Sequence, residues 1–340
     1  MKKLLVSLLA LAMLAGCSST TTGDDETVES TVVKIQFVPS RDVEDIVTVT
    51  DPLKEILTEA MVDKGFENVT FEISVSSDYN VAGEALISGT VDLAFLPAGT
   101  YVAYHEDGAE LLVTCTRAGL SKDSENAADW NDGLATEGDS SSQVGYYRSI
   151  GVAGPSEKGQ ELAAIVNSGE ELTWEDVNSA VWCVSSSTTS SAGYIYPTIW
   201  LMDHFDKKIS DLANVVPTDG YSDTATRLAS EACDIGVGYA DYRRDYAEAW
   251  TTDYGRELTV WEETNVVLVT DGVMNDTISY SANSETLTPE LITALQEAFI
   301  ELAQTEAGLE AIAIYSHEGY VVTTDADYDS SRVAAELSQQ

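Results

Sequence analysis

Apolar and polar positions alternate at the start of the chain and then change to a helical spacing. Residues 32–38 form an apolar run that predicts a strand, closed by a turn at 39–42. Asp51 and Pro52 then open a helix with one apolar face that ends at Gly65, and residues 71–75 alternate again. The order strand, helix, strand predicts a βαβ unit, which implies a parallel sheet with helices on its faces.

One segment of the chain occurs twice. Residues 79–94 align without gaps with residues 221–236, and both copies have Tyr, Leu, Ser and Asp at matching positions. Each copy has the pattern of a helix, a tight turn and a buried strand. The repeat predicts two related α/β lobes.

The chain between the two copies is expected to change lobe. Residues 121–142 are rich in Ser, Asp, Asn and Gly and predict a surface excursion, and residues 145–153 then begin a strand of the second lobe. Further strands and helices are predicted by the same patterns, namely strands at 180–184 and 264–270 and helices at 289–303 and 306–315. We expect the last two helices to pack back on the first lobe.

These elements predict a two-lobed α/β fold in which each lobe is a mainly parallel sheet flanked by helices. The first lobe would comprise residues 32–145 and 257–340, and the second lobe residues 146–256. The chain would therefore cross between the lobes twice, through two hinge segments.

The first residues have the pattern of a targeting segment. Lys2 and Lys3 precede a short apolar run, and residues 14–17, Leu-Ala-Gly-Cys, resemble the bacterial lipoprotein signal. An ordinary signal peptide is the alternative. We expect residues 1–16 to be a signal peptide, Cys17 to be lipidated and residues 17–31 to be a flexible tether. The protein would then be extracytoplasmic and held to the membrane by its N-terminal lipid alone.

The chain is strongly acidic. It carries 58 acidic and 17 basic residues, a net charge of −41, which argues against nucleic acid as a partner. The acidic residues are spread along the chain, so they mainly solvate the surface. This charge repels an anionic ligand at long range, so the capture of an anion would depend on local hydrogen-bond donors.

Cysteine and histidine give no pattern of a metal site. After the predicted lipidation site, three cysteines without CxxC spacing remain, so at most one disulfide can form, and we expect three buried reduced thiols: Cys115, Cys183 and Cys233. The three histidines are far apart in the sequence: His105, His204 and His317. We therefore expect neither a zinc centre nor another cofactor.

Residues 185–194 contain a run of hydroxyl side chains directly after a predicted strand and before an apolar helical segment. A helix start leaves unpaired N–H groups and a positive dipole end, so hydroxyls at this place can form a cradle for an anion. The carboxyl end of a parallel strand is also where such sheets bind ligands. Thr188, Thr189, Ser190 and Ser191 are therefore candidate ligand contacts. A Ser/Thr-rich loop with one capping residue is the alternative.

At these residues the sequence resembles a known family. Residues 187–197 resemble the Ser-Thr-Ser-Gly-Tyr-x-x-Pro segment of the phosphonate-type substrate-binding proteins of ABC transporters. Surrounding pieces of that family recur in the same order, at residues 38–41, 79–101, 145–149 and 234–244. The resemblance covers nearly all of the mature chain and implies a two-lobed periplasmic-binding-protein fold with an anion between the lobes. It implies a receptor that delivers a phosphonate, phosphite or phosphate to an ABC permease.

The resemblance also implies roles for single residues. Thr188, Ser190 and Ser191 match hydroxyls that hold the phosphonate oxygens, and Tyr79 and Tyr147 match tyrosines that reach the ligand. Each tyrosine could instead be a half-buried residue between the lobes.

Charged candidates complete the predicted site. Asp241 matches an acidic position near the far end of the ligand. Asp223 and Asp241 could accept a hydrogen bond from a singly protonated phosph(on)ate, which would discriminate against fully ionised sulfate, or Asp223 could only cap its helix. Ser40 and Arg41 follow the first strand, where Arg41 could bind an oxyanion bidentately or pair with neighbouring acidic residues. The sequence departs from the family at Ser222, where many relatives have histidine, so a preference for an aminoalkyl substituent does not carry over.

Enzymes are the main rival class. The sequence has no Gly-x-Ser-x-Gly elbow, Walker loop or His-Glu-x-x-His motif, and no histidine stands near a candidate nucleophile. We therefore expect no catalysis and a monomeric receptor. A receptor for another small organic anion that feeds a sensor remains an alternative, and so does a hydrolase.

Overall fold

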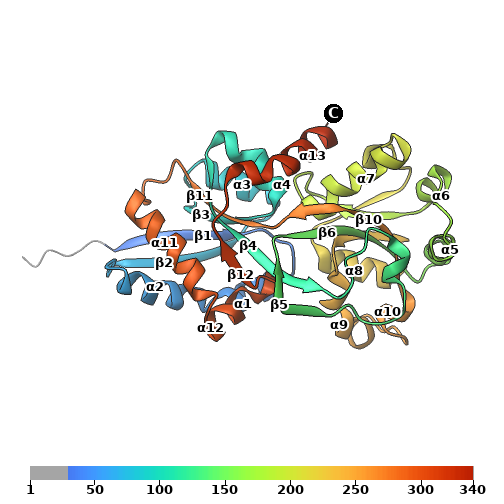
Figure 1. Ribbon diagram of the computed structural model, residues 1–340, viewed down its shortest axis with the longest axis horizontal. Coiled ribbons are helices and arrows are strands. Elements are labelled where there is room, and N and C mark those ends of the chain that lie inside the picture. The colour runs from blue at the N-terminus through green and yellow to red at the C-terminus, as the bar shows by residue number, and fades with distance from the viewer. Residues whose placement is uncertain (1–29, 340) are drawn as a thin grey trace, which may run out of the picture.

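The computed structural model describes residues 30–339. Within this range the strands form two sheets, each the centre of one lobe, and the lobes lie side by side along the long axis (Figure 1). No helix in this part of the chain is long and apolar enough to cross a bilayer. The predicted signal peptide, the lipidation site Cys17 and nearly all of the predicted tether lie outside the described residues.

The first lobe contains a seven-stranded sheet in the order β12-β4-β11-β3-β1-β2, with β5 paired to β4. β2 and β3 flank β1 in parallel, whereas β11, β4, β12 and β5 are antiparallel to their neighbours. The strands are β1 (Thr31–Phe37), β2 (Val69–Val75), β3 (Leu93–Leu96), β4 (Ala109–Leu120), β5 (Gly138–Val144), β11 (Thr277–Ser281) and β12 (Gly319–Val321).

The second lobe contains a five-stranded sheet in the order β10-β6-β9-β7-β8. β7 pairs in parallel with β8 and β9, and β6 runs antiparallel to both β9 and β10. The strands are β6 (Tyr146–Ala153), β7 (Trp182–Ser185), β8 (Val215–Thr218), β9 (Ile235–Tyr239) and β10 (Asn265–Met274).

Helices cover the faces of both sheets. Those of the first lobe are α1 (Val43–Thr50), α2 (Leu53–Asp63), α3 (Tyr79–Ile87), α4 (Ala98–Tyr104), η1 (His105–Asp107), α11 (Pro289–Leu302), α12 (Glu306–Ile312), η6 (Ala313–Tyr315), η7 (Asp325–Tyr328) and α13 (Asp329–Gln339). Those of the second lobe are α5 (Glu157–Asn167), α6 (Trp174–Ser179), η3 (Ser191–Ile195), α7 (Tyr196–Phe205), η4 (Ile209–Asp211), α8 (Tyr221–Ala229), η5 (Tyr242–Arg244), α9 (Ala247–Thr252) and α10 (Val260–Glu263).

Local patterns account for the core of the first lobe. Alternate residues of β1 are buried, and they pack against one face of α2 and against α11 in a single hydrophobic cluster. Leu53, Leu57 and Met61 recur at the i, i+4 spacing that places them on one side of the helix. As predicted, α11 and α12 pack back on this lobe, where they contact α2.

The repeat has the predicted structure in both lobes. Residues 79–94 form α3 and the start of β3, and residues 221–236 form α8 and the start of β9. Each copy runs as helix, tight turn and buried strand. The two tyrosines at equivalent positions, Tyr79 and Tyr221, begin the two helices.

The sheets differ from the predicted mainly parallel form. Only the pairs around β1 and β7 are parallel. The strands next to the crossings, β4, β5, β6, β10 and β11, pair antiparallel with their neighbours, and so does β12. The return to the first lobe also comes later than residue 257. β10 pairs with β6 of the second lobe, and the chain crosses only at residues 275–276 before β11.

The predicted surface excursion is more structured than its composition suggested. It forms η2 (Ala127–Trp130) and β5, and the Trp130 side chain is buried. The side-chain amide of Asn131 donates to the carbonyl of Val266 at 2.9 Å and accepts from its N–H at 2.7 Å. The excursion therefore docks on β10 of the second lobe.

The expectation of three reduced cysteines is wrong. Cys183 in β7 and Cys233, two residues before β9, form a disulfide with their Cα atoms 5.7 Å apart, and Cys115 is a buried free thiol. The two cysteines are separated by 50 positions in the sequence, so the pairing of β7 with β9 brings them together.

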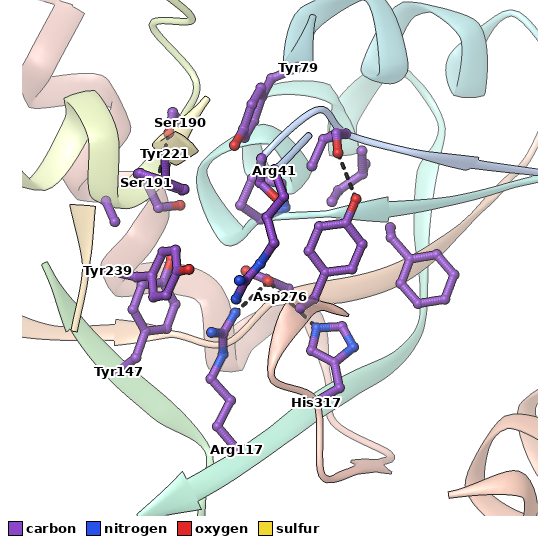
Figure 2. A pocket seen from close by; sticks show the side chains of 17 residues that line it. Arg41, Tyr79, Arg117, Tyr147, Ser190, Ser191, Tyr221, Tyr239, Asp276 and His317 are labelled. Atoms are coloured by element: carbon purple, nitrogen blue, oxygen red, sulfur yellow. Dashed lines mark hydrogen bonds and ion pairs between the residues drawn. The ribbon is translucent and has the colours of Figure 1, made fainter. Parts of the chain in front are cut away.

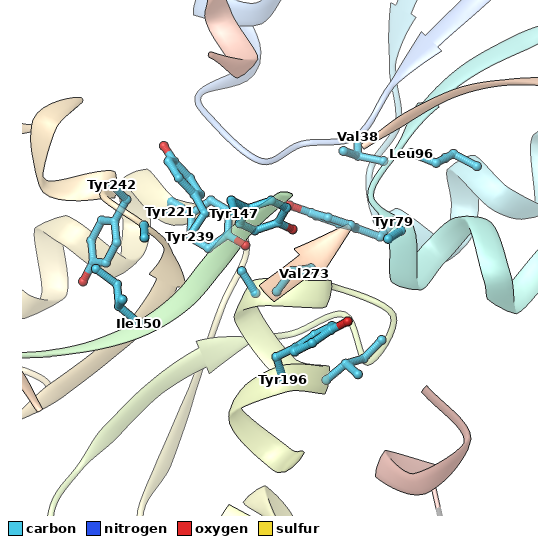
Figure 3. Packing of buried hydrophobic residues seen from close by; sticks show 14 of the residues in the cluster. Val38, Tyr79, Leu96, Tyr147, Ile150, Tyr196, Tyr221, Tyr239, Tyr242 and Val273 are labelled. Atoms are coloured by element: carbon cyan, nitrogen blue, oxygen red, sulfur yellow. The ribbon is translucent and has the colours of Figure 1, made fainter. Parts of the chain in front are cut away.

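A hydrophobic cluster continues from one lobe into the other. It contains Val38 and Tyr79 of the first lobe and Tyr147, Tyr221 and Tyr239 of the second (Figure 3). The phenol rings thus meet where the lobes face each other, which is also where the candidate site lies.

Candidate ligand-binding site

A small cavity lies between the two lobes (Figure 2). Its volume is about 40 Å³, a few times the roughly 10–15 Å³ that a single buried water requires. Both lobes and the crossing supply its polar lining, which consists of Ser40, Arg41, Tyr79, Arg117, Tyr315 and His317 from the first lobe, Tyr147, Ser190, Ser191, Tyr221 and Tyr239 from the second, and Asp276 from the crossing. The volume suits a group of only a few heavy atoms.

The start of η3 forms one wall of this cavity. The chain leaves β7 at Ser185, turns through the hydroxyl-rich loop and enters η3, which continues directly into α7. Ser190 is the N-cap residue, and its Oγ accepts from the N–H of Gly193 at 3.3 Å. The Ser191 Oγ accepts from the N–H of Gly99 in the first lobe at 2.8 Å. The Ser191 hydroxyl proton remains available for a ligand, beside the first N–H groups of the helix. The Ser190 Oγ also lies 3.5 Å from the Tyr221 hydroxyl, and either group of this pair can donate to the other or to a ligand.

Further hydroxyl donors come from the loop after β1 and from α3, β6 and α8. The Ser40 Oγ is buried and has no hydrogen-bond partner among residues 30–339. Burial raises the pKa of Tyr79 and Tyr147 well above the usual range and raises the pKa of Tyr221 to about 12. All three phenols therefore stay protonated at neutral pH and can donate to an anion.

The opposite wall contains two guanidinium groups. Arg117 donates to Asp276 at 2.7 Å and stacks over the Tyr147 ring at 4.7 Å from its centroid. Arg41 donates across the lobe boundary to Asp245 at 2.8 Å. Each arginine is thus paired with a carboxylate, so the guanidinium groups supply donors without a large excess of positive charge.

Asp276 and His317 differ in charge, although both are deprotonated at neutral pH. Burial alone would raise the pKa of Asp276, but the charge of Arg117 more than offsets this and holds that pKa below the usual range. Burial lowers the pKa of His317, although Asp276 opposes the change. Asp276 is therefore ionised and His317 neutral at pH 7.

Within residues 30–339, one group of three side chains is compact enough to ligate a metal ion. Single ligand atoms of Cys115, Asp276 and His317 lie within 4.8 Å of one another. Arg117 already donates to Asp276 at this place, and burial raises the pKa of Cys115, which keeps its thiol protonated. The arrangement therefore fits an ion pair beneath an anion site better than a metal centre.

Six of the ten predicted site residues line the cavity. They come from the loop after β1, from α3, from β6 and from the start of η3, and they are Ser40, Arg41, Tyr79, Tyr147, Ser190 and Ser191.

The other four predicted residues lie elsewhere. Thr188 is exposed, and Thr189 is buried but bonds to Thr100 and Asn80 of the first lobe. Asp223 points along α8 and pairs with Arg227 one turn later at 2.8 Å.

The fourth of these residues, Asp241, lies in the wall of a second cavity but is not free to bind. Its carboxylate accepts from the buried Arg243 side chain at 2.7 and 2.9 Å and from Thr136 at 2.7 Å. Both acidic residues were expected to face the ligand. In the structure, each of them instead forms an ion pair with a nearby arginine, Asp223 with Arg227 and Asp241 with Arg243.

Sequence reasoning missed half of the polar lining. The missed residues are Arg117, Tyr221, Tyr239, Asp276, Tyr315 and His317. The repeat carried a usable signal for Tyr221, because it aligns with Tyr79 and the two tyrosines line the cavity from opposite lobes. The others stand alone in strands, turns or crossing segments and belong to no local motif.

A larger cavity of about 550 Å³ adjoins the first and shares Arg117, Tyr147, Tyr239 and His317 with it. Of the eight arginines in the chain, four line one cavity or the other, namely Arg41, Arg117, Arg148 and Arg244. Half of the arginines therefore lie at the cleft. The walls of the two cavities also carry five carboxylates, so these arginines supply local hydrogen-bond donors without a net positive charge at the cleft.

Two α/β lobes that enclose a small cavity lined with buried hydroxyl donors define a two-lobed substrate-binding protein. Residues 35–328 match the family described as ABC transporter, phosphonate, periplasmic substrate-binding protein, and the chain belongs to this family. The resemblance noted in the sequence is thereby confirmed. The protein is an extracytoplasmic substrate-binding component of an ABC importer.

Individual relatives agree with this assignment. The chain is 25% identical over 355 residues to the phosphate-import protein PhnD of Mycolicibacterium smegmatis, covering 97% of this chain and 94% of the relative. Its fold is similar to a binding protein component of an ABC phosphonate transporter from Pseudomonas aeruginosa, with a TM-score of 0.66, 10% identity and coverage of 92% and 87%. It is also similar to PhnD1 from Prochlorococcus marinus in complex with methylphosphonate, with a TM-score of 0.65, 10% identity and coverage of 90% and 98%.

Proposed function

We propose that the inner cavity captures a small phosphorus oxyanion, namely a phosphonate, phosphite or phosphate, and that the closed protein delivers it to the importer's permease. Ser190 and Ser191 would donate to the oxygens from the helix start, Ser40, Tyr79 and Tyr147 from the other walls, and Arg41 from the lobe boundary. The PhnD relative, named for phosphate import, and the neighbour solved with methylphosphonate support this class of ligand.

One observation carries the proposal. Hydroxyl groups from both lobes converge on a cavity at a helix N-terminus, and the buried Oγ of Ser40 finds no protein partner within the described chain. Leaving such a group unpaired is costly unless a ligand bonds to it. A tetrahedral oxyanion accepts several hydrogen bonds from different directions, which suits donors that surround it.

Closure of the lobes would complete the site. Direct hydrogen bonds join the lobes around the cavity, among them Gly99 to Ser191 at 2.8 Å and Arg41 to Asp245 at 2.8 Å. A ligand that lands on one lobe would favour the closed arrangement, because only there do donors of both lobes reach it. The permease would then recognise the closed face.

A thermal-shift screen of residues 31–340 against phosphate, phosphite, methylphosphonate and 2-aminoethylphosphonate tests the proposal. A ligand present at 100 times its Kd stabilises the folded state by about 2.7 kcal/mol, so a specific ligand raises Tm by several degrees. Acetate and citrate serve as controls for other small anions. No shift with any phosphorus oxyanion, at concentrations up to 10 mM (roughly 100 times a Kd of 0.1 mM), rejects this ligand class.

The anchor and the oligomeric state belong to the same proposal. Cys17 would carry the lipid that holds the receptor at the membrane, and the receptor would act as a monomer. In the bacterial host, Cys17→Ser should move the protein from the membrane fraction to the soluble extracytoplasmic fraction. Light scattering on the soluble domain should give the mass of a single chain.

A further inference from the structure

A carboxylate in the wall of an anion-binding cavity calls for an explanation. Among the cavity-lining residues of the described chain, Asp276 is the only acidic one. Its Oδ2 accepts from Arg117 at 2.7 Å and lies 3.6 Å from the Nε2 of His317. For its Oδ1, the part of the chain that the structure describes offers no hydrogen-bond partner, and the side chain is 16% exposed. Figure 2 shows this carboxylate facing Arg117 within the cavity.

An ionised carboxylate can only accept hydrogen bonds. A fully deprotonated oxyanion is also an acceptor only, so its oxygens and Asp276 would repel each other in a poorly solvated space. A phosphorus oxyanion that keeps one P–OH removes this conflict, because the hydroxyl donates to Asp276 while the other oxygens accept from the serines and tyrosines.

We infer that Asp276 selects the protonation state of the ligand by accepting a hydrogen bond from its P–OH group. This inference rests on the proposed function. It assigns to Asp276 the role that the sequence suggested for Asp223 and Asp241, whose carboxylates are paired with Arg227 and Arg243 instead. The ligand class is thereby narrowed to oxyanions that carry a hydroxyl at neutral pH, and sulfate and alkylsulfonates are excluded.

The groups around Asp276 do not titrate near neutral pH. Groups that interact with its charge come from β4, β6, α3, α8, η6, η7 and the segment around β12, and they are Cys115, Arg117, Tyr147, Tyr79, Tyr221, Tyr315, Tyr328, His317 and Tyr320. Burial raises the pKa of each of these tyrosines and of Cys115, and the pKa of His317 is lowered from 6.5. Between about pH 7 and pH 9 the ligand's own hydroxyl is therefore the group whose titration changes the site.

Matched ligands test the inference on the wild-type protein. Methanesulfonate has the shape and charge of singly protonated methylphosphonate but no hydroxyl, and sulfate differs from hydrogen phosphate in the same way. By titration calorimetry we expect each sulfur anion to bind about 10- to 100-fold more weakly than its phosphorus counterpart, the contribution of one hydrogen bond to a charged group.

The pH dependence provides a second readout. Methylphosphonate loses its last P–OH above its second pKa, so its affinity should fall by up to about tenfold per pH unit there, in proportion to the protonated fraction. Phosphate keeps one P–OH up to pH 9 and serves as the control, with a nearly constant affinity.

Asp276→Asn supplies the third readout, because an amide can donate to a sulfate oxygen. We expect this variant to gain affinity for sulfate relative to phosphate, which a purely structural ion pair with Arg117 does not predict. If the variant does not fold, the ligand comparison on the wild type decides.

The possible outcomes separate the two proposals. Sulfur anions that bind within about threefold of their phosphorus counterparts, or a methylphosphonate affinity that stays constant to pH 9, overturn the inference and leave the proposed function standing. Absence of binding for every phosphorus oxyanion at every pH overturns both.

Discussion

Replacing Ser190 with alanine separates the helix start from the rest of the site. The Ser190 side chain is almost fully buried, lines the cavity and caps η3 by accepting from Gly193. Its hydroxyl proton is the group that we expect to reach an anionic oxygen. Because hydrogen bonds to charged groups contribute about 1.5–3 kcal/mol, Ser190→Ala should weaken binding roughly 10- to 150-fold.

The same substitution also removes the helix cap. Loss of an N-cap side chain costs about 0.5–2 kcal/mol of folding free energy, so some thermal destabilisation of the unliganded protein is expected. Titration calorimetry at a temperature well below Tm measures Kd on folded protein, and urea unfolding measures the stability loss separately. The increase in Kd should be larger than that caused by a substitution elsewhere in the same loop.

Thr188→Ala is the matched control. Thr188 lies in the same loop, is exposed, and forms no side-chain hydrogen bond with any part of the described chain. Its replacement should leave Kd unchanged. Equal affinity of Ser190→Ala and wild type, or an equal loss in Thr188→Ala, would refute the assignment of the anion to the start of η3.

Three further predictions concern closure and stability. A Cβ at Gly99 would lie 2.7 Å from a backbone oxygen of the second lobe, so Gly99→Ala should weaken ligand binding at least tenfold and shift small-angle scattering toward an open form. Asp241→Asn breaks the buried pair with Arg243 and should cost about 3–5 kcal/mol in urea unfolding, while the Kd of the variant that remains folded stays within about twofold of wild type. Reduction of the Cys183–Cys233 disulfide, which closes a loop of 50 residues, should lower stability by about 4 kcal/mol, seen as a lower Tm in reductant.

The sequence contained most of the fold because its local signals agree with its topology. The spacing of Leu53, Leu57 and Met61 defines α2, and the repeat of residues 79–94 at 221–236 places one helix-turn-strand unit in each lobe. The sequence did not show which sheet the strands next to the crossings would join. The apolar run of β10 looks the same whether it pairs with β6 of the second lobe or with a strand of the first, so the boundary between the lobes was placed too early.

The site was predictable where hydroxyls gather at an element boundary and not where single residues converge from distant segments. Ser190 and Ser191 stand in a run that marks a helix start. Arg117, Asp276 and His317, by contrast, meet only after two segments of the first lobe and the crossing have folded. Ion pairing also decides which of the predicted acidic residues are free to bind a ligand. An isolated acidic residue in the sequence gives no sign of the arginine that will neutralise it.

The C-terminal helix α13 contacts both lobes at once, through α4 on one side and α7 on the other, and the hydroxyls of Tyr196 and Ser331 lie 3.2 Å apart across the second of these contacts. Any separation of the lobes must strain or release one of the two attachments. A fluorescent label near Leu337, which is 36% exposed, would therefore report on ligand capture from outside the cavity. For the same reason, a purification tag is better placed at the other end of the domain, where it cannot bias the opening equilibrium.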